Sequence, residues 1–284
     1  MLPAGCRRAN VVARDGSVLG SGSAGPANPL REPDRTIRAI LAATDQALED
    51  ASLAGLARDR LIAGIGLAGV NVPAAFKAMS DWGHPFRELF LTTDMHIACY
   101  GAHGAGDGAV IISGTGCSGY AIVDGVHRTF SGFGFPFGDS GGSDWIGLEA
   151  LRHVFLAIDG LGPSTELVGA LNAHFGAEGI GIVEKLANAQ PCDFGRLAPI
   201  VFDAANQGDE IANAIVENAA NHIAALARRI LQLKPSRLSL VGGLGTTILP
   251  RLDHDVRENL SPALNTASDG AIIFAREQLS AAVA

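Results

Sequence analysis

Three glycine-rich turns, each close to a short apolar run, are the parts of this sequence best suited to chemistry. They are ISGTG at Ile112–Gly116, GFGFPFGDSGGSDWIG at Gly132–Gly147 and LVGGLG at Leu240–Gly245. A strand that ends in residues without Cβ atoms allows backbone N–H groups to converge on an anion, and phosphate is the anion that most commonly needs this. The three turns together predict a site for a nucleotide and a second small molecule.

Transfer of a phosphoryl group requires donors for the phosphates, a divalent cation and a base that accepts the proton of the attacking hydroxyl. We expect Gly114, Thr115 and Gly116 to bind the β- and γ-phosphates of ATP through backbone N–H groups and the Thr115 hydroxyl. The candidates for packing against the purine or ribose, where the backbone must approach closely, are Gly242, Gly243 and Gly245.

Asp94 is the candidate general base. It follows the apolar strand predicted at Leu89–Thr93, and the carboxyl ends of strands border the ligand site in α/β sheets. A carboxylate at that edge can accept a proton from a hydroxyl. The alternative is that Asp94 serves only as the N-cap of the helix that follows.

Three further residues are candidates for binding the second small molecule, a polyol. They are Asp139, which lies among glycines, and the turn residues Asn28 and Asn71. The alternative for each is a purely local role, since Asp and Asn commonly stabilise their own turns. No HxxE or HExxH spacing marks a metal site, so the metal ligands stay unknown, and no histidine is assigned to catalysis.

Composition limits the class of partner. The chain has 284 residues, 48% of them hydrophobic, and a formal net charge of −8. It has enough apolar residues for a buried core, but no basic cluster for nucleic acid or an anionic membrane and no apolar run near the roughly 18 residues of a membrane span. The four cysteines are far apart, which is typical of free thiols. We therefore expect a cytoplasmic protein that binds a small molecule, and a homodimer is left open.

The elements that position these residues follow from periodicity and turn signals. The first half predicts a hairpin at Arg8–Gly22 around Asp15-Gly16, a helix at Pro33–Ala51, and strands at Leu61–Leu67 and Leu89–Thr93. The second half predicts a strand from Ala109 into the Gly114–Gly116 turn, strands at Gly119–Val123 and Val126–Ser131, a helix at Asp209–Leu233, a strand at Arg237–Val241 and a helix at Asp269–Leu279.

The second half repeats the order of the first, with one difference. A strand and a glycine turn precede the second hairpin, whereas residues 1–6 leave no room for them before the first. The first repeat is therefore expected to lack its opening strand and phosphate turn. We expect an N-terminal lobe at residues 1–102, with the helix at 269–284 packed against it, and a nucleotide-binding lobe at 103–268.

The motifs, taken in order, are similar to those of a known family. Together with GLAGVN at Gly66–Asn71 and TTD at Thr92–Asp94, they resemble the bacterial N-acetylglucosamine and glucosamine kinases of the BadF/BadG/BcrA/BcrD ATPase group, within the actin, sugar-kinase and Hsp70 superfamily. The resemblance implies two ribonuclease-H-like α/β lobes with ATP and Mg²⁺ in the cleft between them. It implies transfer of phosphate to the 6-hydroxyl of an amino sugar.

The resemblance also implies roles for individual residues. Asp94 matches the catalytic base, Thr115 the second phosphate motif, Gly242-Gly243 the adenosine motif, and Asp139 and Asn28 the sugar contacts. Two departures are visible. The family's opening DGGGT, whose Asp helps to hold the metal, has no counterpart, and its GDEGS is GDSGG here, with Ser140 in place of Glu.

Two other classes of function stay open. A sugar-binding or regulatory protein that lost catalysis would keep the same turns. An ATPase that activates a redox enzyme normally needs cysteines that bind an iron–sulfur cluster at a subunit interface, and the dispersed cysteines speak against it.

Overall fold

The structure is a computed structural model that describes residues 7–25 and 28–283. The chain divides into two compact units. Unit 1 comprises the residues up to Val110, Tyr120–His127 and the residues from Pro262 onward, and unit 2 comprises Ile111–Gly119 and Arg128–Ser261. Each unit is described by itself. The predicted loss of an opening strand concerns residues 1–6, which lie outside the described residues.

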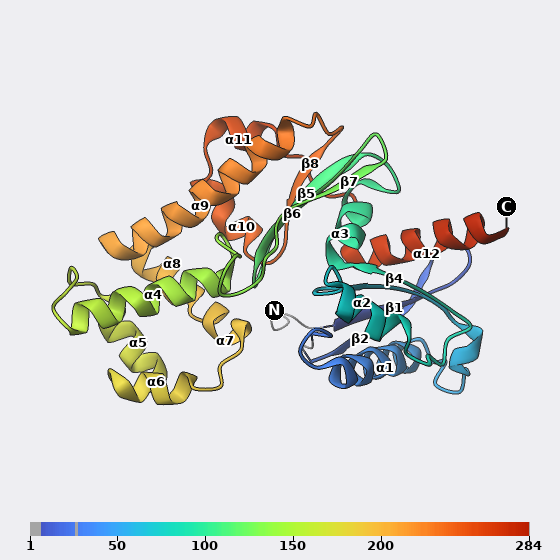
Figure 1. The fold of residues 1–284 in the computed structure, drawn as a ribbon, viewed down its shortest axis with the longest axis horizontal. Coiled ribbons are helices and arrows are strands. Elements are labelled where there is room, and N and C mark those ends of the chain that lie inside the picture. Colours follow the sequence, from blue (N-terminus) through green and yellow to red (C-terminus); the bar gives the residue numbers. More distant parts are fainter. Residues whose placement is uncertain (1–6, 26–27, 284) are drawn as a thin grey trace. The chain divides into compact units, whose positions relative to one another are not determined.

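A hairpin and a helix begin unit 1. Strand β1 (Arg7–Val12) pairs antiparallel with β2 (Val18–Ala24), and α1 (Pro33–Asp50) packs against both (Figure 1). A Cβ atom on Gly20 or Gly22 would overlap with the backbone of α1. The helix therefore approaches the strand more closely than side chains would allow.

Two parallel strands and their helices form the rest of the unit 1 core. Strands β3 (Ile62–Leu67) and β4 (Glu88–Thr93) pair with Leu67 opposite Thr93, and they are followed by α2 (Pro73–Ser80) and α3 (Asp94–His103). A short 3₁₀ helix, η1 (Arg58–Arg60), precedes β3. The apolar cluster includes Ile40, Leu67, Val70, Met79 and Phe86. Because the strands are parallel, the loop after β3 and the start of α3 lie at the same edge.

Helix α12 (Ala267–Val283) packs directly on α3 (Figure 1). A Cβ atom on Gly101 of α3 would overlap with the carbonyl oxygen of Thr266, and one on Gly270 of α12 would overlap with that of Ile97. The contact between the two helices is thus made partly by backbone.

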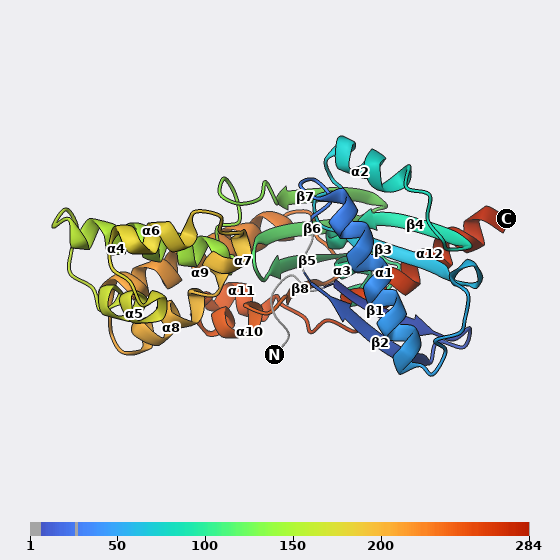
Figure 2. The same cartoon turned by 90° about the horizontal axis from the view of Figure 1, so that it is seen from below.

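A four-stranded sheet has the order β7 (Val126–Ser131), β6 (Cys117–Val123), β5 (Gly108–Ser113) and β8 (Leu238–Val241), as Figure 2 shows. Strand β5 lies in the interior of the protein, and Ala109, Val110 and Ile111 have no exposed surface. The glycine turn at residues 114–116 connects β5 to β6.

Unit 2 is otherwise helical. Its helices are α4 (Ser143–Ile158), α5 (Leu167–Phe175), α6 (Ile180–Leu186), α7 (Pro191–Gly195), α8 (Ala198–Asn206), α9 (Glu210–Leu231), α10 (Gly245–Ile248), the 3₁₀ helix η2 (Leu249–Arg251) and α11 (His254–Glu258). Asp209 caps α9 by accepting a hydrogen bond from the Ala212 N–H, at 2.7 Å, and its other oxygen binds the Thr165 hydroxyl, at 2.8 Å. One carboxylate therefore fixes the starts of both α9 and α5.

The predicted hairpin, the helices at residues 33–51, 209–233 and 269–279, and the predicted strands are confirmed, with ends shifted by a few residues. No bounds were predicted for helix α4, which has 16 residues, or for the shorter helices α2, α5 to α8 and α11. None of the helices in the described part of the chain has the length and apolar character that a membrane crossing needs.

The contact between α3 and α12 leads to a test. Replacing a helical Gly by Ala should stabilise a helix by up to about 1 kcal/mol, but in Gly101→Ala the new methyl group must displace the backbone at Thr266. We expect overpacking to exceed the propensity gain and to lower the free energy of unfolding by at least about 1 kcal/mol. The measurement is urea denaturation.

Gly83→Ala is the matched control, because a Cβ atom there meets nothing within 4 Å. Its free energy of unfolding should stay within about 0.5 kcal/mol of the wild type. A Gly101→Ala variant as stable as the wild type would show that α3 and α12 do not pack through their backbones.

Candidate functional site

Asp94 is the first residue of α3, directly after β4. The N-cap of this helix is Thr93, whose hydroxyl oxygen accepts a hydrogen bond from the His96 N–H at 3.1 Å. The Asp94 carboxylate accepts one from the N–H of Met95, at 3.0 Å. Capping is therefore done by Thr93, and Asp94 places a half-buried carboxylate at the carboxyl end of β4.

Asn28 packs against the turn that follows β3. Its side-chain oxygen accepts a hydrogen bond from the Leu30 N–H at 2.9 Å, and a Cβ atom on Gly69 would lie 2.7 Å from the same oxygen. Asn71 is exposed in that turn. Unit 1 thus brings the Gly69–Asn71 turn, the Asn28 side chain and the start of α3 to the edge where β3 and β4 end.

His96 is buried one residue beyond Met95, and its surroundings keep it neutral. Its Nδ1 lies 2.9 Å from the Thr92 hydroxyl, and its Nε2 has no hydrogen-bond partner among the described residues. The ring is packed by Tyr100, Tyr120, His127 and Phe274. Burial, with a smaller contribution from His127, lowers the pKa of His96 to about 4.

Two of the three N–H groups in the turn at residues 114–116 are available, whereas that of Gly114, which was expected to bind phosphate, donates to the Gly116 carbonyl oxygen at 2.9 Å. The carbonyl oxygens of Gly114 and Thr115 accept hydrogen bonds from the Ser143 and Asp144 N–H groups, at 2.9 and 3.0 Å, so the turn is held by the first residues of α4. Among the described residues, the N–H groups of Thr115 and Gly116 donate to no protein acceptor. These donors are available to an anion.

The turn after β8 is held against the end of β5. Gly242 has φ +103°, and a Cβ atom on it would overlap with the carbonyl oxygen of Ser113. That oxygen also accepts a hydrogen bond from the Leu244 N–H at 3.0 Å. A Cβ atom on Gly243, in contrast, would meet nothing within 4 Å. The two predicted nucleotide-binding turns are therefore brought together at the ends of neighbouring strands, and Gly245 begins α10 beside them.

The Asp139 side chain lies against the turn at residues 114–116. Its carboxylate accepts a hydrogen bond from the Cys117 N–H at 3.3 Å. A Cβ atom on Gly116 would lie 2.7 Å from that carboxyl group. Only glycine at position 116 leaves space for Asp139 in this position.

Asp144, in the first turn of α4, was not predicted as a site residue. Its exposed fraction is 1%, and one carboxyl oxygen accepts a hydrogen bond from the Trp145 N–H at 2.7 Å. Burial, and then the nearby Asp139, raise the pKa of Asp144 to about 8. In the sequence the only signal is an Asp close behind the glycines of the motif.

The described residues do not build a cage for a resident metal ion. No group of three or more His, Cys, Asp or Glu side chains in the described ranges could hold one. Mg²⁺ that arrives on a nucleotide is coordinated largely by phosphate oxygens and water, with one or two carboxylates.

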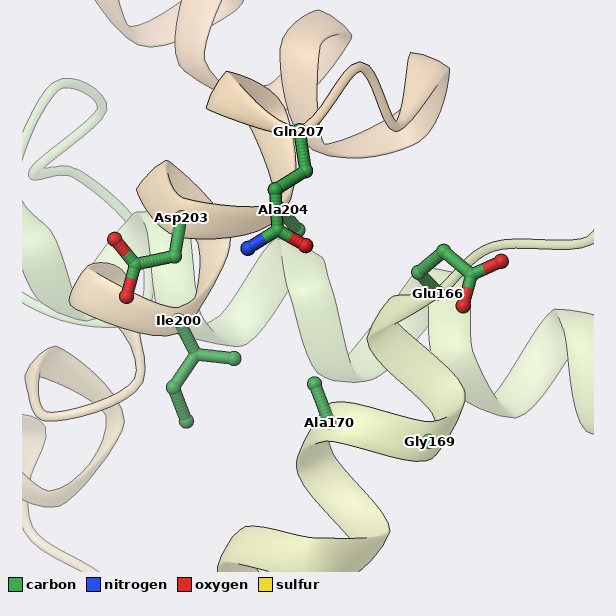
Figure 3. A pocket seen from close by; sticks show the side chains of 7 residues that line it. All are labelled: Glu166, Gly169, Ala170, Ile200, Asp203, Ala204 and Gln207. Carbon is green, nitrogen blue, oxygen red and sulfur yellow. The ribbon is translucent and has the colours of Figure 1, made fainter.

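The cysteines Cys99, Cys117 and Cys192 are free, as predicted, and Cys6 lies outside the described residues. A separate hollow of about 460 Å³ lies between α5 and α8 (Figure 3). Glu166, Asp203 and Gln207 supply its polar groups. None of the predicted site residues lines it.

A sequence profile of the BadF/BadG/BcrA/BcrD ATPase family matches residues 5–279. The chain belongs to this family. Among its relatives, the glucosamine kinase GspK of Vibrio cholerae serotype O1 is 30% identical over 268 residues, which cover 94% of this chain and 91% of that protein. The N-acetyl-D-glucosamine kinase of Dictyostelium discoideum is 33% identical over 148 residues, which cover 46% and 43%.

Solved structures show the same fold as this BadF/BadG/BcrA/BcrD ATPase family member. A candidate N-acetylglucosamine kinase from Chromobacterium violaceum has 28% identity and a TM-score of 0.90, with 96% of each chain covered. A protein from Porphyromonas gingivalis has 17% identity and a TM-score of 0.68, with 94% of each covered. The predicted family and the α/β fold of the actin-like ATPase class are confirmed.

His96 leads to a test of pH dependence. Its pKa is about 4 in the folded protein against 6.5 for an ordinary histidine, so the unfolded chain binds more protons between these values. The stability that His96 contributes is present above pH 6.5 and is lost as the pH falls toward 4. We expect His96→Phe to lose less free energy of unfolding than the wild type between pH 7 and pH 4.5, measured by urea denaturation.

His254→Gln is the control, since the His254 side chain is 76% exposed. It should show the wild-type pH dependence. If His96→Phe shows the same acid loss as this control, His96 is not buried as a neutral ring.

Proposed function

We propose that this protein is an ATP-dependent kinase that phosphorylates the 6-hydroxyl of glucosamine or N-acetylglucosamine. Its family and its kinase relatives support ATP use and transfer to a sugar. The observation that carries the proposal is the pair of unpaired N–H groups at Thr115 and Gly116, next to the open backbone of Gly243. Both features occur at the ends of neighbouring strands, where a nucleotide would need them.

In this proposal the turn at residues 114–116 binds the β- and γ-phosphates. The N–H groups of Thr115 and Gly116 and the Thr115 hydroxyl donate to phosphate oxygens and stabilise the charge that develops on them. The adenosine packs on Gly243, where no side chain intervenes. Gly242 and Gly245 hold this turn in shape.

Asp94 is proposed as the base. As O6 of the sugar attacks the γ-phosphorus, the bond from that phosphorus to the β,γ-bridging oxygen breaks and the O6 proton passes to the Asp94 carboxylate. The products are the sugar 6-phosphate, ADP and one proton, which Asp94 releases to solvent. Asn28, Asn71 and Asp139 are proposed to bind the sugar hydroxyls.

The direct test is an ADP-release assay with MgATP and each amino sugar, followed by NMR of the product to locate the phosphate. We expect sugar-dependent ADP release and a phosphate on carbon 6. Sugar binding by calorimetry without ADP release would favour a non-catalytic sugar-binding protein. ATP hydrolysis that is independent of sugar would favour an ATPase that activates a partner.

Replacing the proposed base gives a second prediction. Asp94→Asn keeps the shape of the side chain but cannot accept the proton, so kcat should fall by about 10²–10⁴-fold while KM for the sugar changes little. Asp81→Asn is the control, because Asp81 is an exposed carboxylate paired with Lys77. An Asp94→Asn enzyme with wild-type kcat would remove Asp94 from this role.

The adenosine turn provides a third test, with neighbouring glycines as a matched pair. Gly243→Val adds a side chain in open space and should raise KM for ATP about tenfold or more, a loss of about 1.4 kcal/mol, without lowering the melting temperature. Gly242→Ala strains a φ of +103° and overlaps with Ser113, so it should lower the melting temperature. Wild-type KM for ATP in Gly243→Val would show that adenosine binds elsewhere.

A further inference from the structure

Ser113 contacts all three glycine-rich turns of unit 2. It is the last residue of β5, and its exposed fraction is 0%. Its carbonyl oxygen accepts a hydrogen bond from the Leu244 N–H in the turn after β8, at 3.0 Å, and its hydroxyl donates one to the Gly141 carbonyl oxygen, at 2.8 Å. The turn at residues 114–116 follows it directly. One buried residue therefore holds, through two different groups, the proposed adenosine turn and the segment that carries Asp139.

The Gly141 carbonyl oxygen depends on the Ser113 hydroxyl. Gly141 and Gly142 are buried, and no backbone N–H in the described ranges donates to the Gly141 oxygen. A buried carbonyl group that loses its donor is destabilised, because it has no water to replace the lost hydrogen bond. The backbone at Gly141 therefore needs a donor at position 113, which is 28 residues away in the sequence.

The segment at residues 139–142 is closely packed on two sides. The Gly142 N–H donates to the Asp139 carbonyl oxygen at 2.6 Å, and φ is +67° at Asp139 and +94° at Gly141. A Cβ atom on Gly141 would lie 2.9 Å from the Ile223 side chain of α9. One on Gly142 would lie 2.6 Å from the backbone of Gly116. The segment thus fills the space between α9 and the Gly116 backbone.

We propose that Ser113 is a positioning residue for the sugar: its hydroxyl holds the backbone at Gly141 and thereby keeps the Asp139 carboxylate at the turn of residues 114–116. This inference rests on the proposed function, in which Asp139 binds sugar hydroxyls. The Asp139 carboxylate itself accepts a hydrogen bond from the Cys117 N–H at 3.3 Å, which is long for such a bond. The bond from the Ser113 hydroxyl has an ordinary length, so it is the stronger anchor of the segment.

The two contacts of Ser113 can be separated by mutation. Ser113→Ala removes the hydroxyl but keeps the backbone carbonyl that accepts the Leu244 N–H. The turn after β8 should therefore keep its shape, whereas the Gly141 carbonyl loses its donor. We expect KM for the sugar to rise about tenfold and KM for ATP to change by less than about twofold. The change in kcat should be smaller than that in KM for the sugar, because Asp139 is proposed to bind the sugar before and during the transfer.

Ser239 provides a matched control. It lies in β8, its exposed fraction is also 0%, and its hydroxyl donates to the Ser261 carbonyl oxygen at 2.7 Å. Ser261 belongs to none of the three glycine-rich turns. Ser239→Ala therefore removes a comparable buried hydrogen bond, and both variants should lose similar free energy of unfolding in urea. Only Ser113→Ala should change KM for the sugar, which distinguishes positioning from a general loss of stability.

The experiment combines steady-state kinetics, with MgATP and each amino sugar, and hydrogen exchange measured by mass spectrometry without ligands. Peptides that cover residues 139–142 should exchange faster in Ser113→Ala than in the wild type, because the segment has lost its anchor. The same peptides should exchange at the wild-type rate in Ser239→Ala. The exchange measurement does not require an active enzyme.

The outcomes separate this inference from the proposed function. In an active enzyme, wild-type KM for the sugar in Ser113→Ala would overturn the positioning role, as would an equal rise in Ser239→Ala. Absence of phosphorylation by the wild type with either sugar would instead remove the proposed function, and hydrogen exchange would still show whether Ser113 holds the segment. If Ser113→Ala does not fold, Ser113→Cys, whose thiol is only a weak donor, decides the question by the same two measurements.

Discussion

The close approach of two strand ends in unit 2 is the constraint on which the candidate nucleotide site depends. The backbone at Gly242 lies so near to the Ser113 carbonyl that a Cβ atom has no space there, and the Leu244 N–H bonds to the same carbonyl. This contact occupies the Ser113 carbonyl oxygen and the Leu244 N–H. A Cβ atom on Gly243 would meet nothing within 4 Å, so the backbone of Gly243 stays open. The turn at residues 114–116 is constrained in a similar way by α4, whose first N–H groups donate to the carbonyl oxygens of Gly114 and Thr115. The N–H groups of Thr115 and Gly116 have no acceptor among the described residues.

In the proposed function this site attracts phosphate with backbone dipoles, although the whole chain carries a net charge of −8. The donors are fixed before the ligand arrives, so little reorganisation is needed when charge develops on the phosphate. A carboxylate beside the turn opposes this attraction, and Asp139 already supplies one. Asp144 begins the helix that holds this turn, and burial raises its pKa to about 8, which favours the neutral acid at neutral pH.

The strands and the long helices were predictable because their signals are local. Asp15-Gly16 marks a hairpin, and the apolar period of residues 209–233 marks a helix. The helices α5 to α8 are five to nine residues long, too short for a clear period, and were not predicted. The candidate site residues Asp94 and Thr115 could be proposed from the sequence because they follow strands. Asp144 was not singled out, because Asp is rarely buried, whereas this one is 1% exposed and its N–H bonds to Thr115 far away in the sequence.

The surroundings of Asp94 agree with its proposed role as the base, which accepts the hydroxyl proton late in the phosphoryl transfer. The N-terminus of α3 carries partial positive charge, which stabilises a carboxylate, and Thr93 takes the capping role that would otherwise compete for the Asp94 oxygens. In a loose phosphoryl-transfer transition state the attacking hydroxyl has formed little of its bond to phosphorus, so it keeps its proton until late, when its acidity has risen steeply. In the proposed reaction a carboxylate is then a sufficient acceptor for that proton, and the neutral His96 close to Asp94 in α3 adds no positive charge.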